Sequence, residues 1–127
     1  MLNVKKLKRL KLIIIGLLFG IVGFLVHNYL AKVLQIFPNP GFSFGLYSDL
    51  LLAGVFLVLV VIMTLFWRRG DLGLMIIIIG GLINFTDRII FGYVRDYWSF
   101  YFVYNNLADW IIFFGVLYSI VALWKKK

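Results

Sequence analysis

Four long apolar runs dominate the chain, and most polar residues lie at its ends or between the runs. The runs cover approximately residues 11–30, 48–67, 72–90 and 107–124. Each comes close to the roughly 20 apolar residues that an α-helix needs to cross the hydrocarbon core of a bilayer. We therefore predict an all-α membrane protein, a bundle of four transmembrane helices in one domain over residues 1–127.

The first run follows a basic tail over residues 1–11, as in a secretory signal peptide. The run is longer than a typical signal-peptide core and no A-x-A-like cleavage site follows it, so we interpret it as a retained span. Gly16, Gly20 and Gly23 recur at helical spacing within it. They predict a flat face for close packing against another helix of the same chain, with a dimerisation motif as the alternative.

The first connection, residues 31–47, contains both prolines and cannot be a continuous helix. We expect it at the membrane interface or packed on the bundle. Ser48 is a candidate N-cap for the second helix, with Asp49 in its first turn. Residues 68–71 form a short polar turn before the third helix.

Composition supports a membrane protein, because 64% of the residues are hydrophobic and only 14% are charged. The absence of cysteine excludes disulfides, thiol nucleophiles and Cys-ligated metals. The single histidine, His27, leaves no partner for a His-based metal site or a Ser-His-Asp triad. Glutamate is also absent, so carboxylate chemistry has to come from the five aspartates.

Basic residues are distributed unevenly between the two ends of the predicted bundle. Ten Lys and Arg fall in the N-terminal tail, the 68–71 turn and the C-terminal end, whereas the opposite side has only Lys32, Arg88 and Arg95. The positive-inside rule places both termini in the cytoplasm and the connections 31–47 and 91–106 outside. This topology accounts for most of the net charge of +8, which therefore implies no nucleic-acid partner.

A polar island over residues 83–110 holds three of the five aspartates, Asp87, Asp96 and Asp109. Ionisable groups at membrane depth are costly and indicate a functional site. Asn84, Asp87 and Arg88 follow i, i+3, i+4 spacing and share a helix face, where Asp87 and Arg88 can neutralise each other.

Two further aspartates of the island flank the second outer connection. Gly92 permits a sharp change of direction before Asp96. Asn106 can cap the fourth helix with Asp109 in its first turn. Two aspartates brought together at the mouth of a bundle can share one proton, as an aspartic protease requires. The alternative, that all three aspartates serve as caps and intramembrane ion pairs, stays open from spacing alone.

Four blocks in this chain resemble signal peptidase II, the bacterial lipoprotein signal peptidase family. They are Asn39–Gly45 (NPGFSFG), Asn84–Arg88 (NFTDR), Gly92–Tyr97 (GYVRDY) and Asn106–Asp109 (NLAD). The resemblance implies an aspartic endopeptidase with a dyad of Asp96 and Asp109. It also implies site-supporting or substrate-contacting roles for Asn28, Lys32, Asn39, Gly41, Phe44, Asn84, Asp87, Arg88 and Asn106.

The same resemblance implies the substrate and the location. The family cleaves diacylglyceryl-modified prolipoproteins just before the lipidated cysteine, in the bacterial cytoplasmic (inner) membrane and at its extracytoplasmic side. It uses no metal or cofactor, and we expect a monomer whose two outer connections form a small cradle or flap over the substrate. The expected partners are prolipoproteins and membrane lipid.

The chain departs from the family pattern at several positions. Asn28 stands where an aspartate is common, Ile83 replaces a glycine, and Asn105 and Trp110 flank the last block in place of phenylalanine and a small residue. The segment between Asp96 and Asp109 is also short for the family. The short segment concerns the flap-like element that covers the substrate rather than the dyad, and Asn28 removes a charge but keeps hydrogen-bonding capacity.

Two groups of residues have simpler interpretations. His27 is interpreted as a polar residue near a helix end, and the aromatic residues between Tyr93 and Tyr104 as an interfacial belt and an apolar wall. The alternative function is a non-catalytic four-span protein that binds lipoprotein precursors or another membrane partner. A transporter is disfavoured because the second and fourth runs contain little polar chemistry apart from Thr64 and Ser119.

Overall fold

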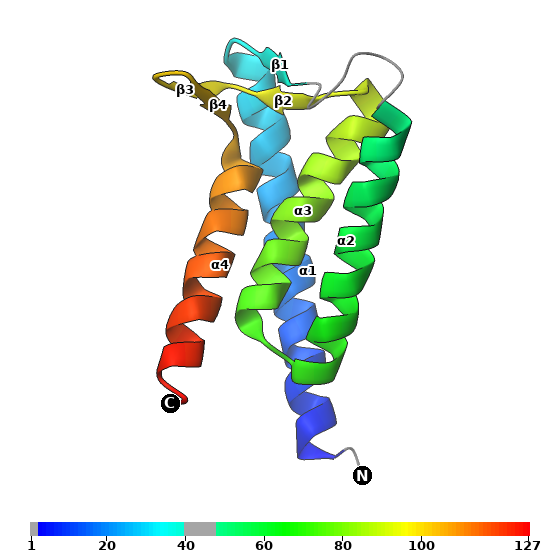
Figure 1. Cartoon of the computed structure of the whole chain (residues 1–127), viewed down its shortest axis with the longest axis vertical. Coiled ribbons are helices and arrows are strands. Elements are labelled where there is room, and N and C mark those ends of the chain that lie inside the picture. Colours follow the sequence, from blue (N-terminus) through cyan, green and yellow to red (C-terminus); the bar gives the residue numbers. More distant parts are fainter. Residues whose placement is uncertain (1–2, 40–47) are drawn as a thin grey trace.

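The computed structural model describes residues 3–39 and 48–127, with side chains of the second stretch described from residue 53. Within these residues the chain is mostly helical. The helices are α1 (Val4–Val33), α2 (Ser48–Arg69), α3 (Leu72–Phe91) and α4 (Leu107–Trp124). They run alternately up and down, so both termini lie at one end of the bundle and short strands cover the other (Figure 1). The candidate cap at Ser48, with Asp49, lies outside the described side chains.

Helix α1 is longer than the apolar run that predicted it. It begins at Val4, because the Asn3 side chain accepts a hydrogen bond from the Lys5 backbone N–H at 3.1 Å and caps the helix. The basic tail is therefore helical, which agrees with the favourable helix propensity of lysine and arginine. The helix continues to Val33 and turns extended at Leu34, before the prolines.

Helix α3 lies at the centre of the bundle, between α4 and α2 in Figure 1, and contacts all three other helices. Asp71 caps its first turn by accepting the Gly73 N–H at 2.7 Å. Gly92 ends it in the left-handed conformation, at φ 79°, which is the sharp change of direction that the sequence predicts. The buried core is made by Phe66, Met75, Ile78, Ile79, Ile83, Ala108 and Ile111.

Glycines set the closest helix approaches. A methyl group at Gly80 would stand 2.6 Å from the Ala108 carbonyl oxygen of α4. On α1, an added carbon at Gly16 would clash with Met75, and one at Gly23 would lie 3.4 Å from Ile83. The predicted glycine face of α1 is therefore confirmed as a packing face within the chain.

The outer connections contain β-strands, so the all-α prediction is wrong there. Strand β1 (Phe37–Asn39) pairs antiparallel with β2 (Val94–Asp96), with Phe37 opposite Asp96. Strand β3 (Trp98–Phe100) pairs with β4 (Val103–Asn105) in a second two-stranded sheet. Strand pairing satisfies backbone groups that a proline-containing or short connection cannot satisfy as a helix.

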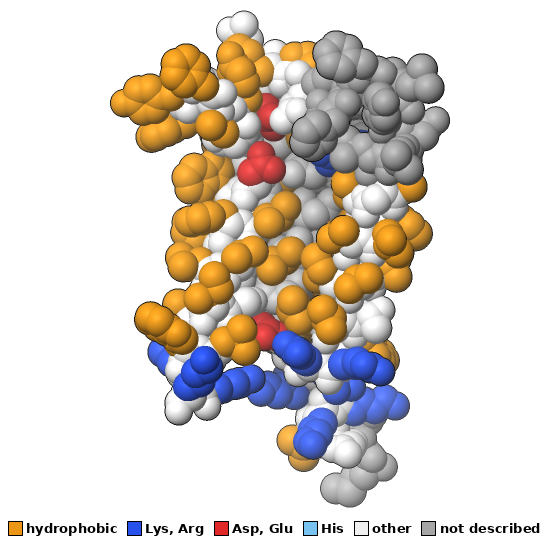
Figure 2. Space-filling view, in the orientation of Figure 1, with side chains coloured by type: hydrophobic (Ala, Val, Ile, Leu, Met, Phe, Trp, Pro, Cys, Tyr) orange, Lys and Arg blue, Asp and Glu red, His pale blue; other side chains and the backbone are white. Residues whose placement is uncertain are grey.

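The surface has the polarity of a membrane protein. Figure 2 shows a broad hydrophobic band, with Lys and Arg gathered at the end that carries the termini and acidic side chains visible near the opposite end. Among the described residues, three helices are long and apolar enough to cross a membrane, namely α1, α3 and α4. Helix α2 is 22 residues long.

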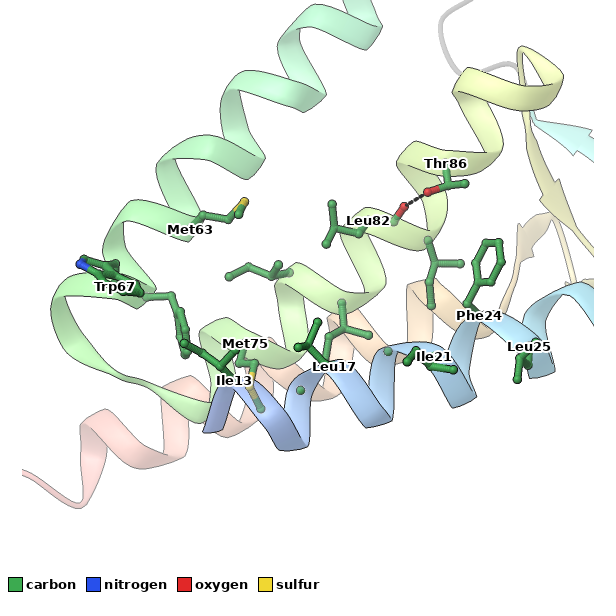
Figure 3. A pocket seen from close by; sticks show the side chains of 16 residues that line it. Ile13, Leu17, Ile21, Phe24, Leu25, Met63, Trp67, Met75, Leu82 and Thr86 are labelled. Carbon is green, nitrogen blue, oxygen red and sulfur yellow. Dashed lines mark hydrogen bonds between the residues drawn. The ribbon is translucent and has the colours of Figure 1, made fainter. Parts of the chain in front are cut away.

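An apolar groove of about 580 Å³ opens between α1 and α2, with α3 as its floor. Figure 3 shows Met63 and Trp67 on α2 across from Leu17 and Ile21 on α1. Its described lining carries no charged side chain, and Thr86 at one end donates its hydroxyl to the Leu82 carbonyl at 2.8 Å. The described lining of the groove therefore includes none of the aspartates of the polar island.

The Gly80→Ala variant tests the close approach of α3 and α4. We expect it to lower the free energy of unfolding by about 1–3 kcal/mol, because the added methyl group meets backbone that cannot move aside. The measurement is thermal or denaturant unfolding in one detergent. The matched control is Gly54→Ala on α2, where an added carbon meets nothing within 4 Å and should be neutral or slightly stabilising. Equal effects of the two variants would contradict this packing.

Candidate active site

The polar island folds into one cluster at the strand-covered end of the bundle. Helix α3 contributes Asn84, Asp87 and Arg88 from its last turns, strand β2 contributes Asp96, and the start of α4 contributes Asn106 and Asp109. Asp96 and Asn106 are completely buried, and Asp87 is 1% exposed. Buried carboxylates in an apolar bundle require hydrogen-bond partners, and Asp87 and Asp96 both have them, as does the half-buried Asp109.

Asn106 connects the two aspartates that the sequence pairs as a dyad. Its Nδ2 donates to Asp96 Oδ1 at 2.8 Å and to Asn84 Oδ1 at 3.0 Å. Asn84 Nδ2 in turn donates to Asp109 Oδ1 at 2.9 Å. Asp96 and Asp109 are thus held in one network by two side-chain amides.

The start of α4 fixes Asp109 from its other side. Asn106 Oδ1 accepts the Asp109 backbone N–H at 3.1 Å, and Asp109 Oδ2 accepts the Asn106 backbone N–H at 3.1 Å. This reciprocal capping box confirms the predicted cap. A local helix-capping motif therefore also sets the orientation of a site carboxylate.

The first connection reaches the same site. Asn39, the last residue of β1, donates from Nδ2 to Asp96 Oδ2 at 2.9 Å. Both carboxylate oxygens of Asp96 therefore accept a hydrogen bond from an asparagine. The other two residues expected here, Gly41 and Phe44, lie outside the described residues.

The surroundings of Asp96 raise the pKa of its carboxyl. Burial raises the pKa of its carboxyl above the ordinary value of 3.8, and the nearby Asp109 charge raises it further. Hydrogen bonds from Asn39 and Asn106 and the positive charge of Arg88 act in the opposite direction. A buried carboxyl whose pKa is raised by a neighbouring carboxylate is suited to sharing one proton with it.

Arg88 forms no ion pair with its sequence neighbour Asp87 among the described residues. The carboxylates of Asp109, Asp96 and Asp87 are all near enough to act on its positive charge. Its Nε is buried and has no hydrogen-bond partner among the described residues. Direct pairing of Asp87 with Arg88, one of the two possibilities that the sequence leaves for them, is not found, because adjacent side chains on a helix do not face each other.

Asp87 pairs instead with Arg95 on strand β2, which follows α3. Arg95 Nη2 donates to Asp87 Oδ1 at 2.7 Å, and the Arg95 backbone N–H donates to Asp87 Oδ2 at 3.0 Å. Arg95 also donates to Asn28 Oδ1 on α1 at 2.7 Å. Asn28 thus belongs to the surroundings of the site, whereas the Lys32 side chain is exposed and takes part in none of these hydrogen bonds.

His27 and Tyr97 are parts of the site that the sequence interpretation missed. His27 is completely buried and Tyr97 is 5% exposed, so neither is an interfacial side chain. Burial raises the pKa of Tyr97 to about 12, which keeps its hydroxyl available as a donor. Helical spacing could have revealed His27, since it follows Gly23 by four residues on the buried stripe of α1.

Three aromatic side chains of the second outer connection are exposed, and their place in an interfacial belt stays a prediction. Phe100, Tyr101 and Phe102 are 68%, 88% and 96% exposed.

No group of three or more His, Cys, Asp or Glu side chains suited to a metal ion occurs in the described part of the chain.

Comparison with known families supports one assignment across nearly the whole chain. The family model described as signal peptidase (SPase) II matches residues 10–125. A lipoprotein signal peptidase of Streptococcus pneumoniae is 31% identical over 106 residues, which cover 74% of this chain and 69% of the relative. A lipoprotein signal peptidase of Sinorhizobium fredii is 36% identical over 92 residues, covering 61% of this chain and 55% of the relative.

Solved structures agree with the fold. A bacterial membrane enzyme solved at 1.9 Å superposes with a TM-score of 0.73 over 92% of this chain and 94% of the other, at 19% identity. A second bacterial membrane enzyme structure, at 2.3 Å, gives a TM-score of 0.70 over 87% of each chain, at 17% identity. At these identities the likeness concerns the fold alone.

The Asp87→Asn variant tests the buried ion pair. We expect the free energy of unfolding to fall by about 3–5 kcal/mol, because the Arg95 guanidinium loses its only carboxylate partner within the described residues. The control is Asp71→Asn, which makes the same charge change where asparagine can still cap α3, and should stay within about 0.5 kcal/mol of wild type. Denaturant unfolding in detergent measures both. An equal loss of unfolding free energy in the two variants would show that Asp87 contributes only through the net charge of the protein and not through its pairing with Arg95.

The raised pKa of Asp96 predicts a pH-dependent stability difference. A carboxyl whose pKa is higher in the folded than in the unfolded state favours folding fully below the unfolded value, near 3.8, and this contribution is lost as the pH rises through the folded value. Wild type should therefore lose stability relative to Asp96→Asn, which does not titrate, as the pH rises from 3.8. Unfolding curves of both proteins across this pH range measure the difference. A difference that stays constant or grows in favour of wild type would contradict the raised pKa.

Proposed function

Because the chain belongs to the signal peptidase II family, we propose that it is a lipoprotein signal peptidase, an aspartic endopeptidase that acts on diacylglyceryl-modified prolipoproteins. It cuts just before the lipidated cysteine and releases the signal peptide. The observation that carries this proposal is the single hydrogen-bond network that holds Asp96 and Asp109 through Asn106 and Asn84.

The proposed chemistry is that of two carboxyls with one shared proton. The protonated member polarises the scissile carbonyl, while the ionised member removes a proton from the attacking water. The buried position of Asp96, which raises its pKa, favours Asp96 as the proton holder, with Asp109 as the carboxylate that activates water. The pair titrates as a unit, so this order describes its resting protonation state.

The remaining site residues have positioning and binding roles in this proposal. Asn84 and Asn106 orient the two carboxylates. The unpartnered Nε of Arg88 can donate to a substrate backbone carbonyl, and Asn39 places the first connection beside the dyad. The paired strands at this end act as a cradle for the substrate segment around the cleavage site.

The same proposal includes a membrane topology. Helix α2 serves as the fourth span, and the end rich in Lys and Arg, which carries both termini, faces the cytoplasm (Figure 2). The dyad then lies at the extracytoplasmic side of a bacterial cytoplasmic membrane. A lipidated substrate would reach it from the bilayer, and the chain would act as a monomer in one domain.

Asp96→Asn and Asp109→Asn test the dyad directly. We expect each to reduce kcat for a synthetic diacylglyceryl-modified lipobox peptide by about 1,000-fold or more, because one carboxyl alone cannot supply both acid and base. Mass spectrometry of the two products in detergent micelles measures the rate and the cleavage position. Asp71→Asn is the matched control, since it removes one carboxylate at the opposite end of α3 and should retain wild-type kcat.

The outcomes separate the competing functions. A folded Asp96→Asn or Asp109→Asn protein that cuts at the wild-type rate would disprove the dyad. A wild-type protein that binds the lipidated peptide without cutting it would instead favour the non-catalytic alternative. Equal cleavage of the peptide with and without its diacylglyceryl group would contradict the proposed substrate.

A further inference from the structure

The buried imidazole of His27 bridges two elements that are distant in sequence. Its Nε2 lies 2.9 Å from Asp87 Oδ2 on α3, and its Nδ1 lies 3.0 Å from the Tyr97 hydroxyl, which follows β2. The His27 side chain has no solvent exposure, so both ring nitrogens depend on these two partners. A histidine is the one side chain that can donate from one ring nitrogen and accept at the other.

The directions of these hydrogen bonds follow from the partners. Asp87 receives hydrogen bonds from Arg95 on both oxygens and offers His27 an acceptor, so Nε2 carries the proton. In the neutral ring Nδ1 is then an acceptor, and the Tyr97 hydroxyl donates to it. The Tyr97 oxygen remains free to accept, and it accepts the Leu107 backbone N–H at 3.0 Å.

This chain of hydrogen bonds ends beside the dyad. Leu107 is the first residue of α4 and directly follows Asn106, the cap that contacts Asp96 and Asp109. Tyr97 also binds this segment through its backbone, since its N–H donates to the Asn105 carbonyl at 3.2 Å. Tyr97 is thus attached on both sides of Asn106, and His27 fixes the orientation of its hydroxyl.

We propose that His27 is a positioning residue for the proposed protease reaction, acting from α1 through the Tyr97 hydroxyl to hold the Asn106–Leu107 peptide, and thereby the two dyad carboxylates, in register. The proposal rests on the proposed function for its catalytic consequence. Its structural part concerns the order of the α4 N-terminus and holds apart from any activity.

A different role for the same contacts would be support of Asp87 alone. In that case the bond from Nε2 would matter and the one to Nδ1 would not. Two substitutions separate these roles, because the side-chain oxygen introduced by His27→Asn reaches the place of Nδ1. The longer side chain introduced by His27→Gln instead brings its amide nitrogen to the place of Nε2. Each variant therefore keeps one half of the bridge.

The experiment compares His27→Asn, His27→Gln and Tyr97→Phe with wild type in the lipidated-peptide assay. We expect Tyr97→Phe and His27→Gln to lower kcat by about 10- to 100-fold with little change in KM, since small misplacement of reacting groups costs rate rather than ground-state binding. His27→Asn should keep most of the wild-type kcat. Adding Tyr97→Phe to His27→Gln should cost little more, because the hydroxyl has already lost its partner.

Two controls accompany these variants. Tyr101→Phe removes the same hydroxyl from a side chain that is 88% exposed and should leave kcat unchanged. Backbone hydrogen exchange of residues 106–109 supplies a readout independent of activity, and should become faster in Tyr97→Phe and His27→Gln but not in His27→Asn.

The results decide between the possibilities. His27→Gln could keep the wild-type kcat and exchange rates while His27→Asn lowers kcat and speeds exchange. In that case His27 supports Asp87 and the positioning role is wrong. If wild type cuts the peptide, Asp96→Asn does not, and Tyr97→Phe is fully active with unchanged exchange, only the positioning role fails. If wild type does not cut, the proposed function fails, and the exchange rates alone confirm or overturn the link from His27 to α4.

Discussion

The organisation of the outer end depends on the cost of burying carboxylates in an apolar bundle. A buried carboxylate without partners is unstable, so each site aspartate has to be surrounded by donors before it can do chemistry. Asn106 meets this requirement for two of them at once, with its side chain donating to Asp96 and its backbone donating to Asp109. The donors that make burial tolerable also orient the carboxylates, so stability and geometry of the site come from the same contacts.

Helix packing in the membrane makes that arrangement possible. Asn84 reaches Asp109 only because α3 and α4 approach closely, and glycines on both helices permit the approach. The first half of α3 therefore carries small residues at its contacts, and its last turns carry the polar ones. The groove between α1 and α2, in contrast to the site, is apolar, with no charged group among its described lining residues.

The sequence predicts features that depend on neighbours along the chain. The capping box at Asn106 and Asp109, the turn at Gly92 and the glycine face of α1 all follow from short-range spacing, and the structure confirms them. The helical membrane class follows from composition in the same way. Helix spacing cannot supply a partner that lies beyond the end of the helix. Asp87 pairs with Arg95 because β2, which follows α3, packs against that helix. His27 was missed for a similar reason, although its position on the buried stripe of α1 marks it as internal.

Asn28 shows how a departure from a family pattern can be balanced within the structure. By sequence alone, the family resemblance leads us to expect an aspartate here, so that Asn28 is the loss of a charge. In the folded chain its side-chain carbonyl accepts from Arg95, whose guanidinium also pairs with Asp87. An aspartate at position 28 would place a second carboxylate on the same arginine, leaving one negative charge in the cluster without compensation. A neutral amide supplies an acceptor for the guanidinium and adds no charge, so the charge of Arg95 is matched by that of Asp87 alone.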